Sequence, residues 1–207
     1  MCRSTFPRHF SSIQQSRFAP TIQGSECFLL SAISCHRFGF LRYSKTGFFP
    51  GSTIGNVASE DATKLLARAR RWSGTERFIL GVDLVKDQAE LISAYDDVQG
   101  ITAAFIGNIL HRMKRELDAD IDAETFRYNA EWNDVAEQIE MSLIATKRQT
   151  VTVGRRSFPF EEGERLQIST SRKFTRNRIE TLAQAAGWAL EDLLTDDRQT
   201  VAIAILR

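Results

Sequence analysis

The chain has 207 residues, of which 43% are hydrophobic and 26% charged, an ordinary composition for one soluble domain or one and a half. Its formal net charge of +1 offers no electrostatic attraction for nucleic acid or for a membrane surface. The longest apolar runs are too short to span a bilayer. We therefore expect a cytoplasmic protein with no nucleic-acid partner and no membrane partner.

The first 45 residues differ from the rest in charge. They hold six basic residues against one acidic residue, Glu26, a net of +5, so the remainder carries −4 to give the total of +1. An organelle transit peptide would explain this composition. A foreign segment, such as a misassigned start or a frame-shifted stretch, is the explanation we favour, because the segment lacks sustained helical amphipathicity. Residues 1–45 are thus predicted to be a disordered leader unrelated to the following fold.

All three cysteines lie in this leader: Cys2, Cys27 and Cys35. Cys27 and Cys35 with His36 resemble part of a metal site, but no second Cys/His pair completes a tetrahedral set. We therefore predict no metal site and three unpaired thiols.

Residues 48–84 have the pattern of a right-handed βαβ unit. Two apolar runs that indicate buried strands flank an amphipathic helix, and a loop rich in Gly, Ser and Thr follows the first strand. The predicted elements are strand 48–50, loop 51–56, helix 59–72 with Ser59 as its N-cap, and strand 78–84. Ligands of open α/β sheets bind outside the carboxyl ends of the strands, where Asn56 and Asp83 lie. An ordinary strand-to-helix connection without a ligand is the alternative.

The middle of the chain departs from this pattern. Asp87 caps a short predicted helix that ends at Tyr95, and a longer helix follows at 102–117, with His111 on its exposed side. Residues 121–134 are predicted to be irregular. Alternation of apolar and polar residues predicts antiparallel strands near 139–146, 150–153, 157–160 and 166–171. The change of period indicates a second lobe inserted into the first.

The last part of the chain returns to the α/β style. Thr175 caps a predicted helix that ends before Gly187 in the C′ position, and residues 188–194 and 200–206 form a hairpin. A sheet that begins with parallel strands and finishes in an antiparallel hairpin is the usual ending of class I methyltransferases.

Several motifs follow one another in a fixed order. They read FPGSTIGN at 49–56, GVDLVKD at 81–87, AYDD at 94–97 with GITAAF at 100–105, RELDAD at 115–120, IEM at 139–141, and GE at 163–164 followed by SRKF at 171–174. Together they closely resemble the histidine-specific, S-adenosylmethionine-dependent methyltransferases of ergothioneine biosynthesis, over residues 46–207. The resemblance implies an α/β fold class: the C-terminal part of a Rossmann-like class I methyltransferase sheet with an inserted α+β substrate-binding lobe.

That family forms trimethylhistidine by three methyl transfers from S-adenosylmethionine, its co-substrate, to the α-amino nitrogen of histidine. The implied partner of this chain is therefore a small amino acid, histidine first of all. The implied domains are a leader at 1–45, a partial methyltransferase domain at 46–85, a substrate-binding lobe at 86–172, and a C-terminal helix and hairpin at 173–207.

The resemblance also implies roles for individual residues. The implied substrate-binding set is Asn56, Thr53, Tyr95, Met141, Ser169, Thr170 and Ser171, and the implied donor-binding pair is Gly51 and Ser52. In this set Asn56 would hold the amino group, Tyr95 would contact the carboxylate, and Met141 would form a wall of the pocket in which residues 169–171 grip the imidazole. No catalytic residue is assigned, because positioning and desolvation do most of the work in methyl transfer to a neutral amine. Without the resemblance, Tyr95 would be a half-buried helix residue and Met141 plain core packing.

The sequence also departs from the family pattern. The family builds its donor site mainly from a glycine-rich turn and an acidic residue upstream of the Asn56 loop, and residues 1–45 offer neither. The family has a glutamate where Ser169 stands, and loss of that bond to the imidazole costs about 1.5–3 kcal/mol, or one to two decades in affinity. Ile106 and Tyr128 replace the family's asparagine and histidine.

Three hypotheses follow from these departures. We favour the first, in which the chain is a fragment of a histidine methyltransferase gene that keeps most of the substrate lobe and cannot bind the methyl donor. In the second, it is a non-catalytic module that binds an amino acid or pairs with a full-length paralogue. In the third, it is a methyltransferase for a different amino-acid substrate, completed by a partner chain.

Overall fold

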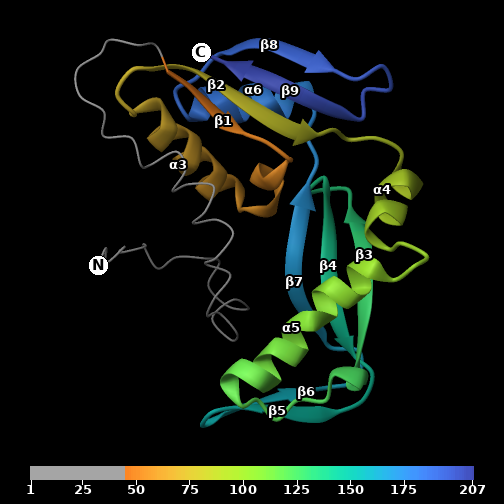
Figure 1. Ribbon diagram of the computed structural model, residues 1–207. Helices are drawn as coiled ribbons and strands as arrows, with labels where there is room; N and C mark the ends of the chain where they lie inside the picture. Colours follow the sequence, from red (N-terminus) through yellow and green to blue (C-terminus); the bar gives the residue numbers. More distant parts are fainter. Residues whose placement is uncertain (1–44) are drawn as a thin grey trace. The chain divides into compact units, whose positions relative to one another are not determined.

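The computed structural model describes residues 45–207, and these form an α/β fold (Figure 1). Their strands make three sheets, one four-stranded, one three-stranded and one two-stranded. The predictions for the leader and its cysteines lie outside the described residues, except that Lys45 begins the first strand. No helix within 45–207 is long and apolar enough to cross a membrane.

The four-stranded sheet joins a parallel pair to an antiparallel hairpin. Its strands, in spatial order, are β1 (Lys45–Phe49), β2 (Thr75–Asp83), β9 (Val201–Leu206) and β8 (Leu190–Thr195). β1 and β2 are parallel and are connected by helix α3 (Ser59–Arg70), whereas β9 is antiparallel to both β2 and β8. This arrangement confirms the predicted parallel βαβ unit and the C-terminal hairpin.

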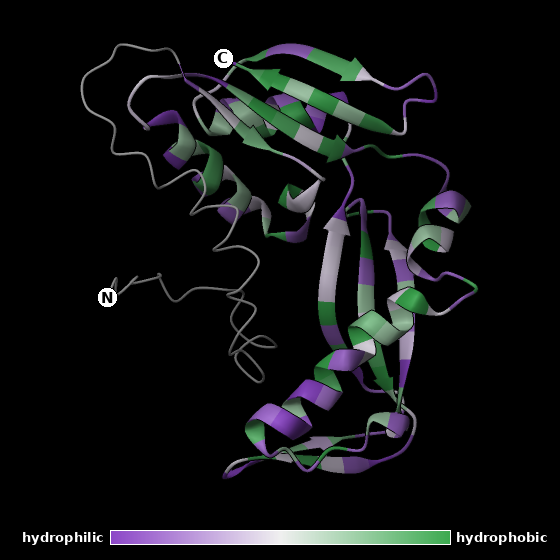
Figure 2. Ribbon diagram, viewed as in Figure 1, coloured by the Kyte–Doolittle hydropathy of each residue, from purple (hydrophilic) through white to green (hydrophobic). Residues whose placement is uncertain are grey.

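The core of this region packs the sheet against α3 and α6 (Arg176–Ala185). Phe78 of β2 and Leu66 of α3 are almost fully buried. The indole nitrogen of Trp188 donates a hydrogen bond to the carbonyl oxygen of Leu66 at 2.9 Å, and its ring lies 5.9 Å from the ring of Phe78. In Figure 2, hydrophobic residues, drawn in green, occupy much of β2 and β9. Burial of this apolar surface fixes β1 and β2, and with them the loops at their carboxyl ends.

The middle of the chain forms a three-stranded antiparallel sheet with two helices packed on it. The elements are α4 (Gln88–Tyr95), α5 (Ile101–Leu117), the 3-10 turn η2 (Ala123–Thr125), and strands β3 (Phe126–Asn133), β4 (Gln138–Ala145) and β7 (Arg165–Arg172), in the order β3-β4-β7. The apolar residues at alternate positions of β4 are all buried, as predicted: Ile139, Met141, Leu143 and Ala145. His111 is exposed on α5, also as predicted.

A separate hairpin connects β4 to β7. Its strands are β5 (Gln149–Val153) and β6 (Arg156–Phe160), and they pair only with each other among the named strands. The ring of Phe160 packs edge-on against Phe126 at 5.4 Å, which anchors this hairpin to the start of β3.

The structure corrects two local predictions. Residues 121–134 are not irregular, because β3 occupies most of this stretch and pairs residue for residue with β4. Glu131 and two asparagines in the strand obscured it, since these residue types are depleted in strands and only the pairing with β4 overrides that preference. Ser59 is not the N-cap of α3, because Ala58 takes that position without a side-chain bond.

The loop after β1 is fixed by close backbone contact with β7. Gly51 and Ser52 both have left-handed backbone angles, with φ of 73° and 55°. They lead into the short 3-10 turn η1 (Thr53–Asn56). A Cβ atom added at Gly55 would lie 2.4 Å from the carbonyl oxygen of Arg172, so only glycine permits this approach. The turn that ends at Asn56 is therefore held against the end of β7.

Candidate functional site

The candidate site lies where the ends of β2, β7 and α4 meet. Asp83 is the last residue of β2, Tyr95 is the last of α4, and Ser171 and Lys173 lie at the end of β7. The Lys173 ammonium donates to Asp83 Oδ2 at 2.6 Å, to Tyr95 Oη at 2.8 Å and to Ser171 Oγ at 3.0 Å. These three acceptors use all three N–H bonds of an ammonium group. We call these four residues the junction cluster.

The charges of this cluster are largely shielded from solvent. The Lys173 side chain is 0% exposed and that of Asp83 is 19% exposed. Lys86 donates to the other Asp83 carboxylate oxygen at 2.9 Å, so two ammonium groups share one carboxylate. The Lys173 ammonium also lies 4.6 Å from the centre of the Tyr95 ring, where a cation–π contact adds to the pairing. A buried cation is tolerated because it is paired and fully hydrogen-bonded, and the surroundings keep a net positive charge.

Backbone bonds hold the cluster in place. The backbone N–H of Asp83 donates to Ser52 Oγ at 2.8 Å, which ties the loop after β1 to the end of β2. The backbone N–H of Phe174 donates to the Asp83 carbonyl at 2.9 Å, and that of Lys173 donates to the Glu137 carbonyl at 2.8 Å. The two sheets are thus joined through the residues that carry the side-chain cluster.

Tyr128 supports the Tyr95 end of the cluster. Its hydroxyl donates to the backbone carbonyl of Tyr95 at 2.8 Å. Burial raises the pKa of Tyr128 to about 12, and the nearby negative charges of Asp96 and Asp97 act in the same direction. Tyr128 therefore remains a protonated donor at neutral pH and holds the end of α4 against β3.

The structure brings several predicted substrate residues together. Tyr95 Oη and Ser171 Oγ lie 2.8 Å apart, within direct hydrogen-bond distance. On the sheet, Met141 lies opposite Ser169, so Ser169, Ser171 and the buried Met141 share one face. Thr170 lies between the two serines and belongs to the opposite face.

Asn56 and Thr53 lie outside this cluster. Asn56 is exposed at the end of η1, and neither residue hydrogen-bonds to the junction cluster within the described part of the chain. Directly after Asn56, the guanidinium of Arg172 donates a hydrogen bond to the Val57 carbonyl at 3.1 Å. Burial lowers the pKa of Arg172, and the neighbouring charge of Arg178 lowers it further. The roles assigned to Asn56 and Thr53 remain predictions.

Sequence reasoning missed Lys173, Asp83 and Lys86 as members of a site. Asp83 stood at the expected functional edge and Lys173 stood inside a motif, but neither received a role. One signal was available, because Lys173 directly precedes a phenylalanine at the end of a strand, a position where burial is expected and lysine is rare. What the sequence could not show is that a carboxylate ninety residues upstream meets it there.

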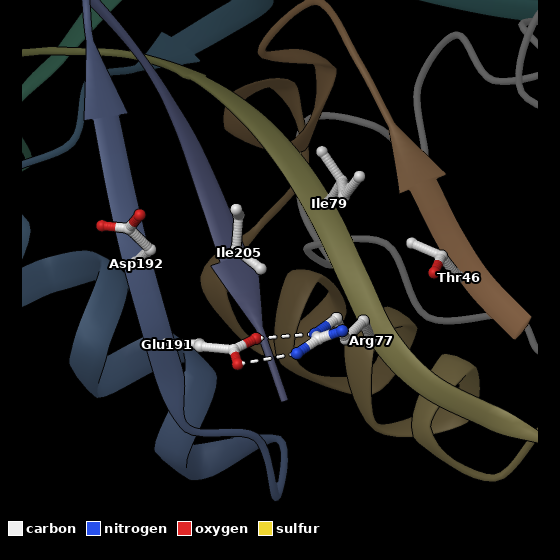
Figure 3. Close-up of a pocket in the computed structure, with 6 residues that line it drawn as sticks. All are labelled: Thr46, Arg77, Ile79, Glu191, Asp192 and Ile205. Atoms are coloured by element: carbon white, nitrogen blue, oxygen red, sulfur yellow. Dashed lines mark hydrogen bonds and ion pairs between the residues drawn. The ribbon is translucent and has the colours of Figure 1, made fainter. Parts of the chain in front are cut away.

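Two open hollows of about 460 and 380 Å³ are lined by other residues, and no predicted site residue lines either. The smaller adjoins the junction cluster, since Leu84 and Phe174 line it. The larger (Figure 3) is lined by Thr46, Arg77, Ile79, Glu191, Asp192 and Ile205. Arg77 and Glu191 already form a two-bond ion pair there, at 2.8 and 2.9 Å, in contact with solvent. The predicted site residues that come together are therefore at the junction cluster and not in the hollows. Across residues 45–207, no group of three or more His, Cys, Asp or Glu side chains is placed to hold a metal ion.

The model of a family described as histidine-specific, SAM-dependent methyltransferases matches residues 34–207. The chain belongs to this family. The match covers all three sheets and every residue of the junction cluster.

Curated members and relatives of the methyltransferase family are longer than this chain. Histidine N-alpha-methyltransferase of Mycobacterium tuberculosis is 42% identical over 142 residues, 67% of this chain and 44% of that protein. The protein of the same name from Mycolicibacterium smegmatis is 40% identical over 141 residues, 66% of this chain and 44% of that protein. Ergothioneine biosynthesis protein 1 of Neurospora crassa is 29% identical over 145 residues, 66% of this chain and 16% of that protein. The chain spans less than half the length of these relatives.

The described residues fit one edge of a site for S-adenosylmethionine, on which the family depends. Gly51 is exposed, and an added Cβ would meet only Thr53 Oγ1, at 3.8 Å, so a ligand can approach the backbone there. Ser52 Oγ accepts from the Asp83 N–H and keeps its own hydrogen to donate. Residues 45–207 contain no Gly-x-Gly turn that would hold the remainder of the donor.

Proposed function

We propose that this chain forms the acceptor side of an S-adenosylmethionine-dependent N-methyltransferase that acts on the α-amino group of an amino acid, with histidine as the first candidate. The observation that carries the proposal is the bond between Tyr95 and Ser171, held by the buried Lys173. These are the residues to which the resemblance assigns the carboxylate and the ring of the substrate. Their direct contact means that one compact group can hold both ends of one small amino acid.

The chemistry needs a neutral amine placed in line with the donor. When bound, S-adenosylmethionine supplies an electrophilic methyl group. The side-chain oxygen of Asn56 can accept an N–H of the substrate amine and leave the nitrogen lone pair free. Tyr95 can donate its hydroxyl hydrogen to the carboxylate, and the buried Met141 can exclude water from the ring. Because the reaction requires orientation more than proton transfer, these binding contacts supply most of the rate.

The names of the relatives support histidine as the substrate, its α-amino nitrogen as the methylated atom, and a link to ergothioneine biosynthesis. Two of the matching proteins are named histidine N-alpha-methyltransferase and a third is named for ergothioneine biosynthesis. The whole-enzyme reaction remains a proposal for a chain that spans less than half of those proteins.

Isothermal titration calorimetry of the full chain with L-histidine tests the proposal directly. We expect one-to-one binding that Tyr95→Phe weakens about tenfold, because it removes the donor to the carboxylate. Glu191→Gln, in the hollow of Figure 3, serves as the matched control and should leave the affinity unchanged. No heat with histidine or any other amino acid would contradict the proposal. A parallel titration with S-adenosylhomocysteine shows whether this chain alone also holds the donor, in which case methyl transfer should be assayed by mass spectrometry.

A second candidate is a methyltransferase with a different amino-acid substrate. Ser169 favours it, because its hydroxyl makes no hydrogen bond within residues 45–207 and stands where the family has a glutamate. A serine cannot supply the negative charge that would hold an imidazole N–H. A competition titration with the twenty common amino acids decides the matter, since an amino acid that binds more than tenfold tighter than histidine would establish the second candidate.

A further inference from the structure

Lys173 is the buried charged residue of the described chain, the other buried polar residues within 45–207 being serine and threonine. Its ammonium carries three hydrogens and has no acceptor capacity. All three hydrogens are committed, to Asp83, Tyr95 and Ser171. The proposed function uses the two hydroxyls and leaves Lys173 without a role.

The hydrogen bonds from Lys173 determine which hydrogens of Tyr95 and Ser171 remain free to bind a ligand. Because Lys173 can only donate, the oxygens of Tyr95 and Ser171 must both accept from it. Each hydroxyl has a single hydrogen of its own. At 2.8 Å, one of them donates to the other, so one hydrogen stays available for a ligand. When the bond between the hydroxyls opens, both hydrogens become available.

We propose that Lys173 is a positioning residue that keeps Tyr95 and Ser171 as hydrogen donors toward the substrate. The site then takes acceptors at both ends: a carboxylate at Tyr95 and an uncharged acceptor atom at Ser171. The basic nitrogen of neutral imidazole is such an atom, whereas imidazolium carries N–H donors on both nitrogens and is excluded. The inference rests on the proposed function and defines the ligand state that the site accepts.

The charges around the junction cluster also favour a ligand with a carboxylate and an uncharged ring. From the end of β2 and the segment after it, Asp83 and Lys86 face the cluster, with Lys86 adding a second positive charge. From β3, Tyr128 stays protonated and touches the Tyr95 backbone.

Near the end of β7, the side chain of Glu137 is paired with Arg178. Asp96 and Asp97 follow Tyr95, and Asp97 is turned away to cap α5. At the junction cluster two ammonium groups face one carboxylate, and this excess positive charge favours a carboxylate and opposes a cationic ring.

A purely structural role for Lys173 makes different predictions. If Lys173 only pins β2, α4 and β7 together, its removal disturbs the site whether or not the hydroxyls are present. If it acts through the hydroxyls, its removal has no effect on binding once both hydroxyls are gone.

Vibrational spectroscopy tests the hydroxyl orientation in the full chain without any ligand. The tyrosine doublet in ultraviolet resonance Raman spectra reports whether a phenol oxygen accepts or donates. The difference between wild type and Tyr95→Phe isolates Tyr95 from the other tyrosines. We expect the wild-type spectrum to show a Tyr95 oxygen that accepts a hydrogen bond, from Lys173, and Lys173→Met to lose this acceptor signature. An unchanged signature would overturn the inference, whatever the outcome for histidine binding.

Calorimetry then tests the effect on the substrate. We expect Lys173→Met to weaken histidine binding about 10- to 100-fold in wild type, and to change it less than about twofold in the Tyr95→Phe/Ser171→Ala background. Equal losses in both backgrounds would assign a structural role and overturn the inference. Should Lys173→Met fail to fold, Lys173→Gln replaces it, because its carbonyl oxygen draws one hydroxyl hydrogen inward and should also weaken binding. If wild type binds no histidine, the proposed function fails and the Raman result alone decides the role of Lys173.

The ligand state has its own test in the pH dependence of binding. Free histidine loses its ring charge near pH 6.5. We expect the affinity to be highest above this pH and to fall about tenfold for each unit below it, because only the neutral ring is accepted. An affinity that stays constant or rises between pH 7 and pH 5 would contradict the donor-only site.

Discussion

Two cation–carboxylate pairs in this molecule have similar geometry and different surroundings. Lys173 and Asp83 meet at 2.6 Å with side chains that are 0% and 19% exposed. Arg77 and Glu191, in the hollow of Figure 3, meet at 2.8 Å with side chains that are 53% and 31% exposed. The first pair joins two sheets and continues into two hydroxyls, whereas the second joins β2 to β8 of one sheet, across the intervening strand β9.

The comparison shows how burial changes what a pair of opposite charges does to its surroundings. Water and salt screen the Arg77–Glu191 pair, so its attraction contributes little. The Lys173 ammonium has no water to replace a lost partner, and each of its bonds constrains the group that accepts it. The exposed pair in the hollow therefore constrains a ligand little, whereas the buried Lys173 constrains the two hydroxyls that accept its hydrogens.

We expect the largest loss of folding free energy when Asp83 is removed from the buried pair. Asp83→Ala leaves the buried Lys173 without its carboxylate, and loss of one partner of a buried pair costs about 3–5 kcal/mol of folding free energy. Lys173→Met should cost less, because Lys86 remains with Asp83. Urea unfolding followed by circular dichroism measures both. Equal stability of Asp83→Ala and wild type would show that the junction pair is screened like the pair in the hollow.

The contact between η1 and β7 gives the next effect. Gly55→Ala places a Cβ 2.4 Å from the Arg172 carbonyl oxygen, so the backbone must shift, at a cost of about 1–3 kcal/mol. The same shift moves Asn56 and should weaken histidine binding. Gly107→Ala is the matched control, because nothing lies within 4 Å of its added Cβ and the substitution favours helix α5. Urea unfolding and calorimetry of the two variants should therefore diverge, and equal behaviour would refute the close contact.

Sequence patterns predicted the four-stranded sheet well because its signals are local. The apolar run before Asp83 and the hairpin around β9 each carry their own periodicity. The pairing of β1 with β2 follows from the short connection through α3, and that of β8 with β9 follows from their turn. The strand β3 was missed because its polar residues suit a strand only when β4 lies beside it. The pairing with β4 is part of the tertiary structure, and the local sequence of β3 does not encode it.

The candidate site divides in the same way. Tyr95 and Ser171 were predicted through motifs that resemble a family, and the structure adds that they touch each other. Lys173 could not be assigned from sequence, because its role depends on Asp83, which lies on another sheet. Spacing along the chain carries no information about a contact between residues ninety positions apart.

Tyr128 provides a smaller effect with a defined pH window. Its raised pKa, about 12 against an ordinary 10, means that the folded state holds the phenol proton more tightly than the unfolded state. This contribution to stability is fully present below pH 10 and is lost as pH rises from about 10 to about 12. Tyr128→Phe removes the bond to the Tyr95 carbonyl, at a cost of about 1 kcal/mol at neutral pH, and removes this phenol's share of the alkaline loss. Unfolding midpoints measured from pH 8 to pH 11 should converge for the two proteins, and parallel curves would contradict this assignment.

We expect the smallest change in stability when the exposed Arg77–Glu191 pair is broken. Glu191→Gln removes the charge that faces Arg77 and, at 3.9 Å, Arg207. Both arginines stay in solvent contact, so water replaces the lost carboxylate and the unfolding midpoint should hardly move. Any difference at low salt should vanish at 1 M salt, where the screening length falls to about 3 Å. The Asp83→Ala loss should survive the same salt, because ions do not reach the Lys173 ammonium. If the two variants responded to salt alike, the junction would be solvent-accessible and the fixed hydrogen pattern at Tyr95 and Ser171 would not hold.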